Sequence, residues 1–311
     1  MVLAAILLLA GLPQSDPYAS VRADALRHAY GTYDQAPERV QKIGNDPESK
    51  RVDVEKLISQ LEDLHVNTYE WLIWHESTDW DDLHRFLPLA QKAGINVWVM
   101  VTPPSENPPI ITAHGYSEPF RQDYVKWGEE IAKLSLKYPN LKAWASDDFV
   151  IKNNRRKYTV DYIKEVMAKS RAINPKLAFV PIFYTMFDER GEWLKQFAGV
   201  VDGLQFSHRL LNPRNLNEMD PATPHDVDKK FLEDNVAEIH RDFGANFPVV
   251  ALEYSSIYRV GKPPSNEKTT FLLKLGYEEA GSVLCYLHPS DTAPNRQAIK
   301  DYFTSLKNSG Q

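Results

Sequence analysis

Two adjacent carboxylates, Asp147 and Asp148, stand where a short apolar run that begins at Leu141 comes to its end. Each carboxylate raises the free-energy cost of ionising the other, so such a pair tends to keep one proton near neutral pH. Proton-transfer chemistry uses a carboxyl group of this kind, because a general acid must still carry its proton at the working pH. Aspartates also form turns and cap helices, so a turn is the alternative interpretation until the fold positions the pair.

The composition is that of a globular chain with a large core. The 311 residues are 43% hydrophobic and 25% charged, and the net charge of −6 disfavours nucleic acid or an anionic membrane surface as a partner. Cys285 is the only cysteine, which excludes an intrachain disulfide, and its apolar surroundings predict a buried core position.

The first twelve residues form an apolar run of the length of a signal-peptide core, too short to span a bilayer. We therefore expect residues 1–15 to be a signal peptide or an apolar N-terminal segment, and the protein to be secreted or periplasmic. No positive charge precedes the run and Ala10 offers a weak cleavage site, so a buried N-terminal helix is the alternative. No later segment qualifies as a membrane span.

Short apolar runs alternate with helical patterns along the rest of the chain. The eight runs expected as strands are residues 26–31, 66–74, 95–102, 141–147, 177–184, 201–207, 248–254 and 282–288. Eight such units predict an α/β fold, a single (β/α)₈ TIM barrel over residues 16–311. An open doubly wound sheet would require a glycine-rich phosphate turn, and neither G-x-G-x-x-G nor G-x-x-x-x-G-K-[ST] occurs. We expect no cofactor.

The C-terminal ends of barrel strands converge on one mouth, so the residues at these ends are the candidate site. Carboxylates, histidines and aromatic residues collect there, and Arg209 is almost the only cation, which disfavours phosphate-bearing substrates. Aromatic faces beside carboxylates suit sugars. The predicted substrate-binding residues are His28, Tyr30, Glu70, Trp71, Trp74, His75, Tyr184, His208, Tyr254, Tyr286 and His288.

Glu253 is the one charge in the seventh run and stands near its end, where a buried carboxylate needs a partner or a function. A salt bridge to Arg209 or to a lysine in a loop is the structural alternative. Acids on the fourth and seventh strands approach each other across a closed barrel, so Glu253 and Asp148 are predicted to act together.

The strand ends resemble those of barrel glycoside hydrolases in two ways. Retaining enzymes of this fold carry a general acid after strand four and a nucleophilic Glu after strand seven. Asp148 and Glu253 match these positions, although the usual Asn-Glu pair on strand four is absent. Substrate-assisted hexosaminidases, including the O-GlcNAcase family, carry adjacent acids after strand four, and Asp147 and Asp148 match that pair. The D-x-x-D-x-D-x-E pattern of chitinase-like barrels is not present.

The resemblance implies a glycosidase acting on a neutral or N-acetylated oligosaccharide or polysaccharide, with Asp148 as general acid. Glu253 is then the nucleophile or base, which we favour slightly, or Asp147 acts through the substrate's acetamido group. Two other classes stay open. A metal-dependent barrel hydrolase could use a set drawn from His28, His75, His208, His288 and Asp148. A carbohydrate-binding barrel without catalysis would have a similar sequence.

Overall fold

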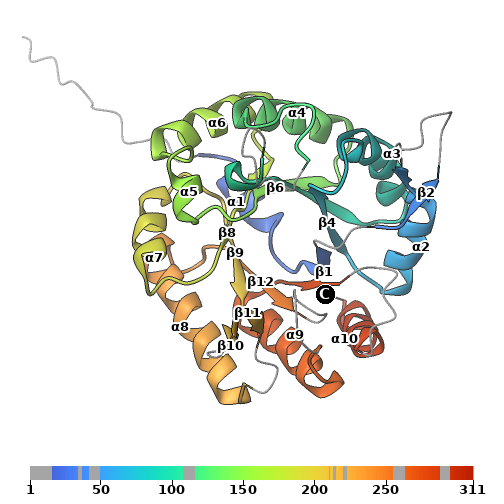
Figure 1. Ribbon diagram of the computed structural model, residues 1–311, viewed down its shortest axis with the longest axis vertical. Helices are drawn as coiled ribbons and strands as arrows, with labels where there is room; N and C mark the ends of the chain where they lie inside the picture. The colour runs from blue at the N-terminus through green and yellow to red at the C-terminus, as the bar shows by residue number, and fades with distance from the viewer. Residues whose placement is uncertain are drawn as a thin grey trace, which may run out of the picture.

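The structure is a computed structural model that describes residues 16–33, 37–41, 50–107, 116–209, 211–212, 215–219, 223–254, 263–287 and 295–310. Its main sheet is strongly curled, an arrangement called the strand ring below, and helices surround it (Figure 1). The main sheet contains β1 Tyr30–Tyr33, β4 Thr68–Ile73, β5 Asn96–Val101, β6 Leu141–Ser146, β7 Ala178–Phe179, β8 Ile182–Phe183, β9 Leu204–His208, β12 Val249–Tyr254 and β13 Val283–Tyr286. The prediction of an α/β fold with alternating strands and helices is confirmed.

The helices alternate with the strands along the chain, and all of them except α1 lie around the outside of the ring. They are α1 Ala19–Asp24, α2 Val54–Asp63, α3 Asp79–Lys92, α4 Tyr124–Lys137, α5 Lys152–Arg155, α6 Val160–Ile173, α7 Glu189–Leu194, α8 His225–Phe243, α9 Asn266–Ala280 and α10 Arg296–Asn308, with the 3₁₀ turns η1 Pro104–Glu106 and η2 Lys195–Phe197. Two small antiparallel pairs, β2 Arg39–Gln41 with β3 Lys50–Val52 and β10 Leu211–Asn212 with β11 Asn215–Met219, lie apart from the main sheet.

The strands of the main sheet pair in the order β7-β6-β5-β4-β1-β13-β12-β9-β8, and all the pairs are parallel. The two strands at the ends of this order, β7 and β8, are consecutive in the chain, with only Val180 and Pro181 between them. The sheet therefore curls so far that its two edge strands, β7 and β8, belong to one continuous segment of the chain.

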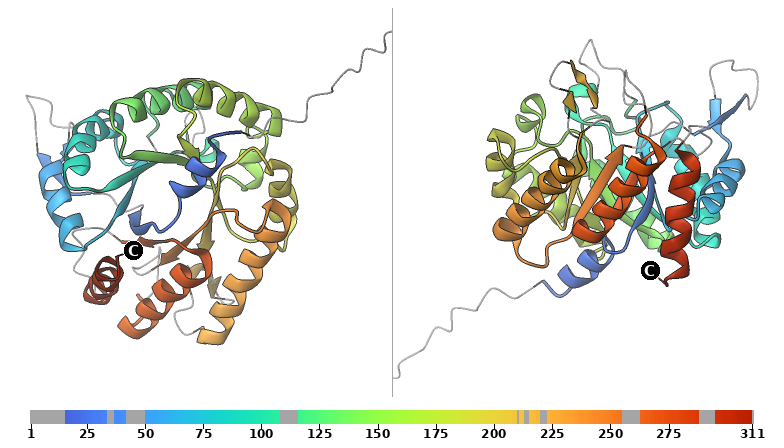
Figure 2. Two further views of the ribbon diagram at one scale, coloured as in Figure 1. Left: turned by 180° about the vertical axis from the view of Figure 1, so that it is seen from behind. Right: turned by 90° about the horizontal axis from the view of Figure 1, so that it is seen from below.

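The first strand begins later than its apolar residues suggest. We expected a strand at residues 26–31, whereas α1 is followed by a turn and β1 starts at Tyr30. Leu26 is fully buried and packs with the residues inside the ring. It is therefore apolar because it covers the end of the sheet where the strands start, and not because it belongs to a strand. Figure 2 shows α1 across the end of the ring where the strands start.

The core has two layers, because successive side chains of each strand point to opposite faces. Leu72, Met100 and Leu252 pack with one another inside the ring. Val99 and Val249, on the opposite faces of their strands, pack between the sheet and the helices. The side chains of every second residue in a strand point into the ring, and those between them point to the helices. A residue near the end of a strand therefore faces the interior only if it occupies one of the inward positions, which we call its strand parity.

Gly31 of β1 lies where no side chain fits, because a Cβ there would come within 1.7 Å of the Thr68 backbone oxygen in β4. Gly31→Ala is expected to lower the free energy of unfolding by about 3 kcal/mol or more, since the backbones must separate. Gly128 in α4 is the control, because its Cβ would meet neighbours only at 3.4 Å and alanine favours a helix. Urea titration measures both variants. A loss below about 1 kcal/mol for Gly31→Ala would contradict the expected clash.

No helix among the described residues is both long and apolar enough to cross a membrane. The expected signal segment, residues 1–15, lies outside the described residues, so export of the protein stays a prediction.

Candidate active site

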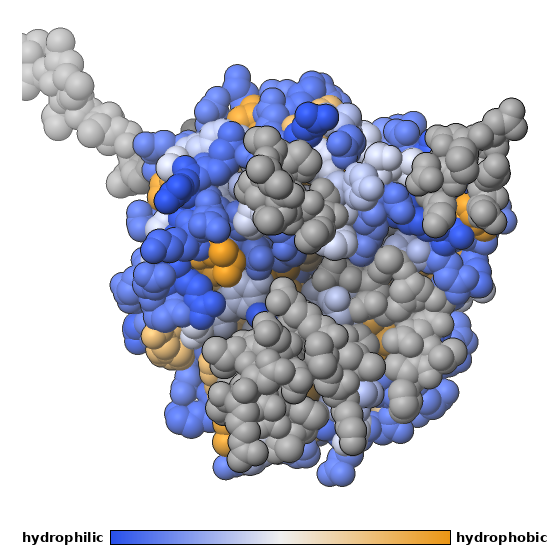
Figure 3. All heavy atoms as spheres, in the orientation of Figure 1, coloured by the Kyte–Doolittle hydropathy of each residue, from blue (hydrophilic) through white to orange (hydrophobic). Residues whose placement is uncertain are grey.

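A cavity of about 300 Å³ opens at the end of the ring where the strands finish. Its walls come from six strands, β1, β4, β5, β8, β12 and β13, and from the segments that follow β4, β5, β6, β8 and β9. Figure 3 views this end of the molecule, whose visible surface is mostly hydrophilic. The cavity is lined by Tyr33, Leu72, Trp74, His75, Met100, Glu106, Asp147, Asp148, Ile182, Tyr184, Arg209, Tyr254 and Tyr286. Of the predicted residues, the structure brings together Asp147, Asp148, Trp74, His75, Tyr184, Tyr254 and Tyr286.

The two aspartates follow β6 directly and have defined partners. The backbone N–H of Asp148 donates to Oδ1 of Asp147 over 2.7 Å, and the Tyr184 hydroxyl donates to Oδ1 of Asp148. Asp148 has a φ of 45°, in the left-handed region that non-glycine residues seldom adopt. Such strain persists where the surrounding structure fixes it, which makes Asp148 a candidate for function.

A buried amide joins the loop of the aspartates to the loop after β5. Asn154 is fully buried, and its Nδ2 donates to the Asp148 carbonyl over 2.8 Å. Its Oδ1 accepts from the backbone N–H of Ser105 over 2.7 Å, next to Glu106. Asn154 therefore fixes the two loops that carry the carboxylates of the cavity. Our sequence analysis did not identify it.

Glu106 is a carboxylate of the cavity that our sequence analysis missed. It ends η1, and its Oε2 accepts from the indole N–H of Trp74 over 2.6 Å. The signal was present, because Glu106 is the only acid in the proline-rich stretch that follows the third expected strand. Asp79, which is buried, supports the same wall by accepting from the backbone N–H groups of Trp74 and His75.

Tyr184 remains a hydrogen-bond donor in this setting. Burial, followed by the negative charges of Asp148 and Asp147, raises the pKa of Tyr184 well above its usual value. The Arg209 guanidinium lies 5.3 Å from the Tyr184 ring centre and 5.6 Å from that of Tyr254. These distances are those of cation–π contacts. Two aromatic rings and the guanidinium group between them thus line the cavity beside the carboxylates.

The prediction that Glu253 and His208 face the mouth is wrong. Both side chains are buried outside the strand ring, and the ring nitrogen Nδ1 of His208 lies 2.7 Å from Oε1 of Glu253. A Cβ at Gly276 of α9 would come within 3.1 Å of that same Oε1, which fixes the outward direction of Glu253. The reason is strand parity: Leu252 and Tyr254 are the inward residues of β12, and Glu253 lies between them.

Two aromatic residues of the predicted site, Trp71 and Tyr30, also occupy outward positions of their strands. The Trp71 ring packs 5.1 Å from the Phe86 ring of α3, and the Tyr30 ring packs 5.7 Å from that of Phe303 in α10. Both rings therefore lie between the sheet and the helices. Glu70 does point into the ring, where it accepts from Gln205 over 2.7 Å, but it does not line the cavity.

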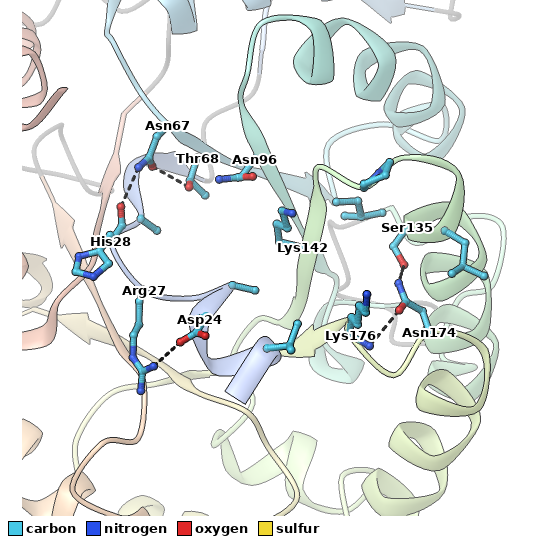
Figure 4. A pocket seen from close by; sticks show the side chains of 16 residues that line it. Asp24, Arg27, His28, Asn67, Thr68, Asn96, Ser135, Lys142, Asn174 and Lys176 are labelled. Atoms are coloured by element: carbon cyan, nitrogen blue, oxygen red, sulfur yellow. Dashed lines mark hydrogen bonds and ion pairs between the residues drawn. The ribbon is translucent and has the colours of Figure 1, made fainter. Parts of the chain in front are cut away.

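His28 lies at the opposite end of the strands, because it precedes β1 instead of ending it. There it lines a second cavity of about 560 Å³, shown in Figure 4. Asp24 is the one carboxylate among the described residues that line this cavity, and it pairs with Arg27 over 2.6 Å. The base therefore offers no pair of carboxylates for acid–base chemistry. His288 lies outside the described residues.

The histidines of the metal hypothesis that the structure describes lie in three different places. His28 lies at the base, His208 faces the helices and His75 lines the cavity. Within the described part of the chain, no group of three or more His, Cys, Asp or Glu side chains is placed to hold a metal ion.

The fold is shared with solved glycoside hydrolases at low sequence identity. An endo-β-mannanase/endo-β-glucanase from Prevotella bryantii aligns with a TM-score of 0.62 and 13% identity over 90% of this chain and 49% of that one. An endoglucanase from Thermotoga maritima aligns with a TM-score of 0.59 and 11% identity over 91% and 99% of the two chains. An α-L-arabinofuranosidase from Thermotoga maritima aligns at 0.55, with 12% identity over 90% and 70%. No protein-family model matches the sequence, and no curated protein matches it.

Proposed function

We propose that this protein is a glycosidase that cleaves an O-glycosidic bond of a neutral or N-acetylated sugar at the C-terminal end of a closed (β/α)₈ barrel. The observation that carries the proposal is the pair Asp147 and Asp148, held at the end of β6 in a cavity with tyrosines, a tryptophan and Glu106. The shared fold with solved glycoside hydrolases supports it. Export of the protein would bring it to extracellular or periplasmic glycans.

Asp148 is the general acid in this proposal. In this role Asp148 donates its proton to the leaving-group oxygen, while a second group stabilises the positive charge that develops at the anomeric carbon. Tyr184 orients Asp148 through its hydroxyl, and the rings of Trp74 and Tyr254 offer faces for sugar C–H groups.

The second role belongs to Asp147 or Glu106, because Glu253 faces the helices. Asp147 would orient the acetamido group of an N-acetylated substrate, whose oxygen then attacks the anomeric carbon. Glu106, fixed by Trp74 on the neighbouring loop, would act on a neutral sugar as a base or nucleophile. The orientation of Asp147 by the backbone N–H of Asp148 favours the first of these mechanisms.

Aryl glycosides of neutral and N-acetylated sugars, assayed in parallel with natural oligosaccharides, test the proposal. We expect hydrolysis of at least one class, with the N-acetylated series preferred. Binding of a sugar without turnover in the whole panel would instead establish a carbohydrate-binding barrel. Hydrolysis that requires an added divalent metal ion and is lost with a chelator would favour the metal-dependent class.

Tyr184→Phe is expected to lower kcat about tenfold, because the carboxylate of Asp148 loses a charge-assisted hydrogen bond and with it a fixed orientation. Tyr162→Phe is the control, since Tyr162 also has a hydrogen-bonded hydroxyl but lies on α6, away from the cavity. Steady-state kinetics on the best substrate compare the two. Equal kcat values for both variants would show that Tyr184 does not position the acid.

A further inference from the structure

A buried pair of ionisable residues, His208 and Glu253, lies directly behind the wall of the cavity. The two are opposite each other in the parallel register of β9 and β12, and each side chain is 1% exposed. Their outward side chains meet between the sheet and the helices α8 and α9. A buried pair of this kind is costly unless its hydrogen bonds are complete, so its place beside the cavity calls for a reason.

The contacts of the His208 ring require a proton between the two side chains. Nε2 lies 3.2 Å from the carbonyl oxygen of Asp228, which can only accept, so Nε2 carries a hydrogen. Nδ1 lies 2.7 Å from Oε1 of Glu253, a distance at which one of the two atoms must donate. Whether the proton resides on Nδ1 or on the carboxyl group, the pair holds one proton more than a neutral imidazole beside a carboxylate.

Charged groups of both neighbouring helices complete this cluster. Asp228 of α8, whose carbonyl meets His208, pairs through its carboxylate with Lys268 of α9. The Lys268 ammonium group also donates to the Thr223 carbonyl over 2.6 Å. The cluster thus connects the ends of β9 and β12 to the start of α8 and the start of α9.

The next residue of each strand reaches the cavity. Arg209 follows His208 and Tyr254 follows Glu253, and both line the cavity with the Arg209 guanidinium 5.6 Å from the Tyr254 ring centre. Arg209 also lies against Tyr184, whose hydroxyl holds Asp148. A displacement of the His208–Glu253 pair therefore passes directly to the residues that face the substrate.

We propose that His208 and Glu253 are positioning residues, which share one proton behind the wall and thereby hold Arg209 and Tyr254 in place for substrate binding. The inference rests on the proposed function, because it concerns the same cavity. When the shared proton is lost, a buried carboxylate faces a neutral imidazole, and the ends of β9 and β12 no longer keep this arrangement.

The direction of the pH dependence follows from both partners. Burial raises the pKa of Glu253. Burial is the largest single effect and acts to lower the pKa of His208, but the charge and hydrogen bond of Glu253, together with the charge and carbonyl group of Asp228, outweigh it, so the net shift is upward. Both folded-state values lie above the unfolded ones, so the pair stabilises the fold at low pH and this contribution is lost as the pH rises through the raised pKa of His208.

The test compares Glu253→Gln with Asp202→Asn over a pH series. Asp202 belongs to another buried ion-paired cluster, with Arg22 over 2.6 Å and Arg171 over 2.9 Å, and it lies two residues before β9 starts, at the end of the strand away from His208. Loss of stability alone would therefore appear in both variants. His208→Gln/Glu253→Gln is the second test variant, because two neutral amides can bond to each other without a buried charge.

In the wild type we expect KM to rise about tenfold between about pH 6 and about pH 9, as the shared proton is lost. Glu253→Gln and the double variant should show the high KM already at the low pH, with a flat profile and kcat within about threefold. Asp202→Asn should keep the KM and the pH profile of the wild type. Wild-type KM values and profiles in both folded test variants would overturn the inference.

Amide hydrogen exchange of β9 and β12 separates this inference from the proposed function, because it requires no substrate. After correction for the base-catalysed intrinsic exchange rate at each pH, we expect the protection factors at the ends of both strands to fall about tenfold at the higher pH in the wild type and to be low at both pH values in Glu253→Gln. Protection that is unchanged by pH and by the substitution would refute the positioning role. Absence of any glycoside hydrolysis would refute the proposed function and leave the exchange result to decide the inference.

Discussion

Asp148→Asn should reduce glycoside hydrolysis by about 10³-fold, because asparagine has nearly the shape of aspartate but cannot supply a proton to the leaving oxygen. The fold should be retained, since asparagine tolerates the left-handed backbone conformation of residue 148. An aryl glycoside with a good leaving group, which needs little protonation, should lose much less. Comparing aryl glycosides with poor and good leaving groups measures this difference.

Asp123→Asn is the matched control for this substitution. Asp123 caps α4 by accepting from the Lys126 N–H over 2.9 Å, and it does not line the cavity. Asparagine is an equally good helix cap, so both activity and stability should remain at the wild-type level. Equal losses on good and poor leaving groups in Asp148→Asn would remove Asp148 from the role of general acid.

Asp147→Asn separates the two mechanisms that remain. If Asp147 orients and polarises the acetamido group, the substitution should lower kcat/KM on N-acetylated substrates by about 10²-fold or more. Substrates with a 2-hydroxyl group should be affected far less, because they have no acetamido group to orient. Kinetics on matched pairs of N-acetylated and 2-hydroxyl aryl glycosides measure the ratio.

Glu106→Gln is the comparison for Asp147→Asn, because it neutralises the neighbouring carboxylate and keeps an acceptor for the Trp74 N–H. A larger loss in Glu106→Gln on 2-hydroxyl substrates would identify Glu106 as the second carboxylate. Uniform losses on all substrates in Asp147→Asn would argue against substrate assistance.

The succession of strands could be predicted from the sequence because parallel strands covered on both faces form continuous apolar runs. The runs at residues 66–74, 95–102 and 141–147 each contain a strand of the main sheet. Because inward and outward positions of such a strand are equally apolar, the sequence does not show which residues of the strand point into the ring and which point to the helices. Glu253 and Trp71 were therefore assigned to the cavity from their place near a strand end, although they face the helices.

Residues that act through loops were the least predictable. Glu106 shares the cavity with Asp148 because the turn after β5 meets the segment after β6, and Asn154 of α5 bonds to backbone groups of both segments. A side chain that recognises backbone atoms leaves no pattern of spacing in the sequence. The pair Asp147 and Asp148 was predictable because it directly follows a strand, where two acids have few structural reasons to stand.

The interruption of the sheet at Val180 and Pro181 divides the molecule into two halves with different tasks. Within the sheet, the strands up to β7 and the strands from β8 onward pair with each other only through β1 and β13. Among the described residues that line the cavity, the first half supplies the carboxylates Glu106, Asp147 and Asp148, whereas the second supplies Tyr184, Arg209, Tyr254 and Tyr286. Recognition can therefore diversify by changes in the second half while the acids of the first keep their geometry. The hydrogen bond from Tyr184 to Asp148 joins the two halves at the cavity itself, so changes in the second half must preserve it.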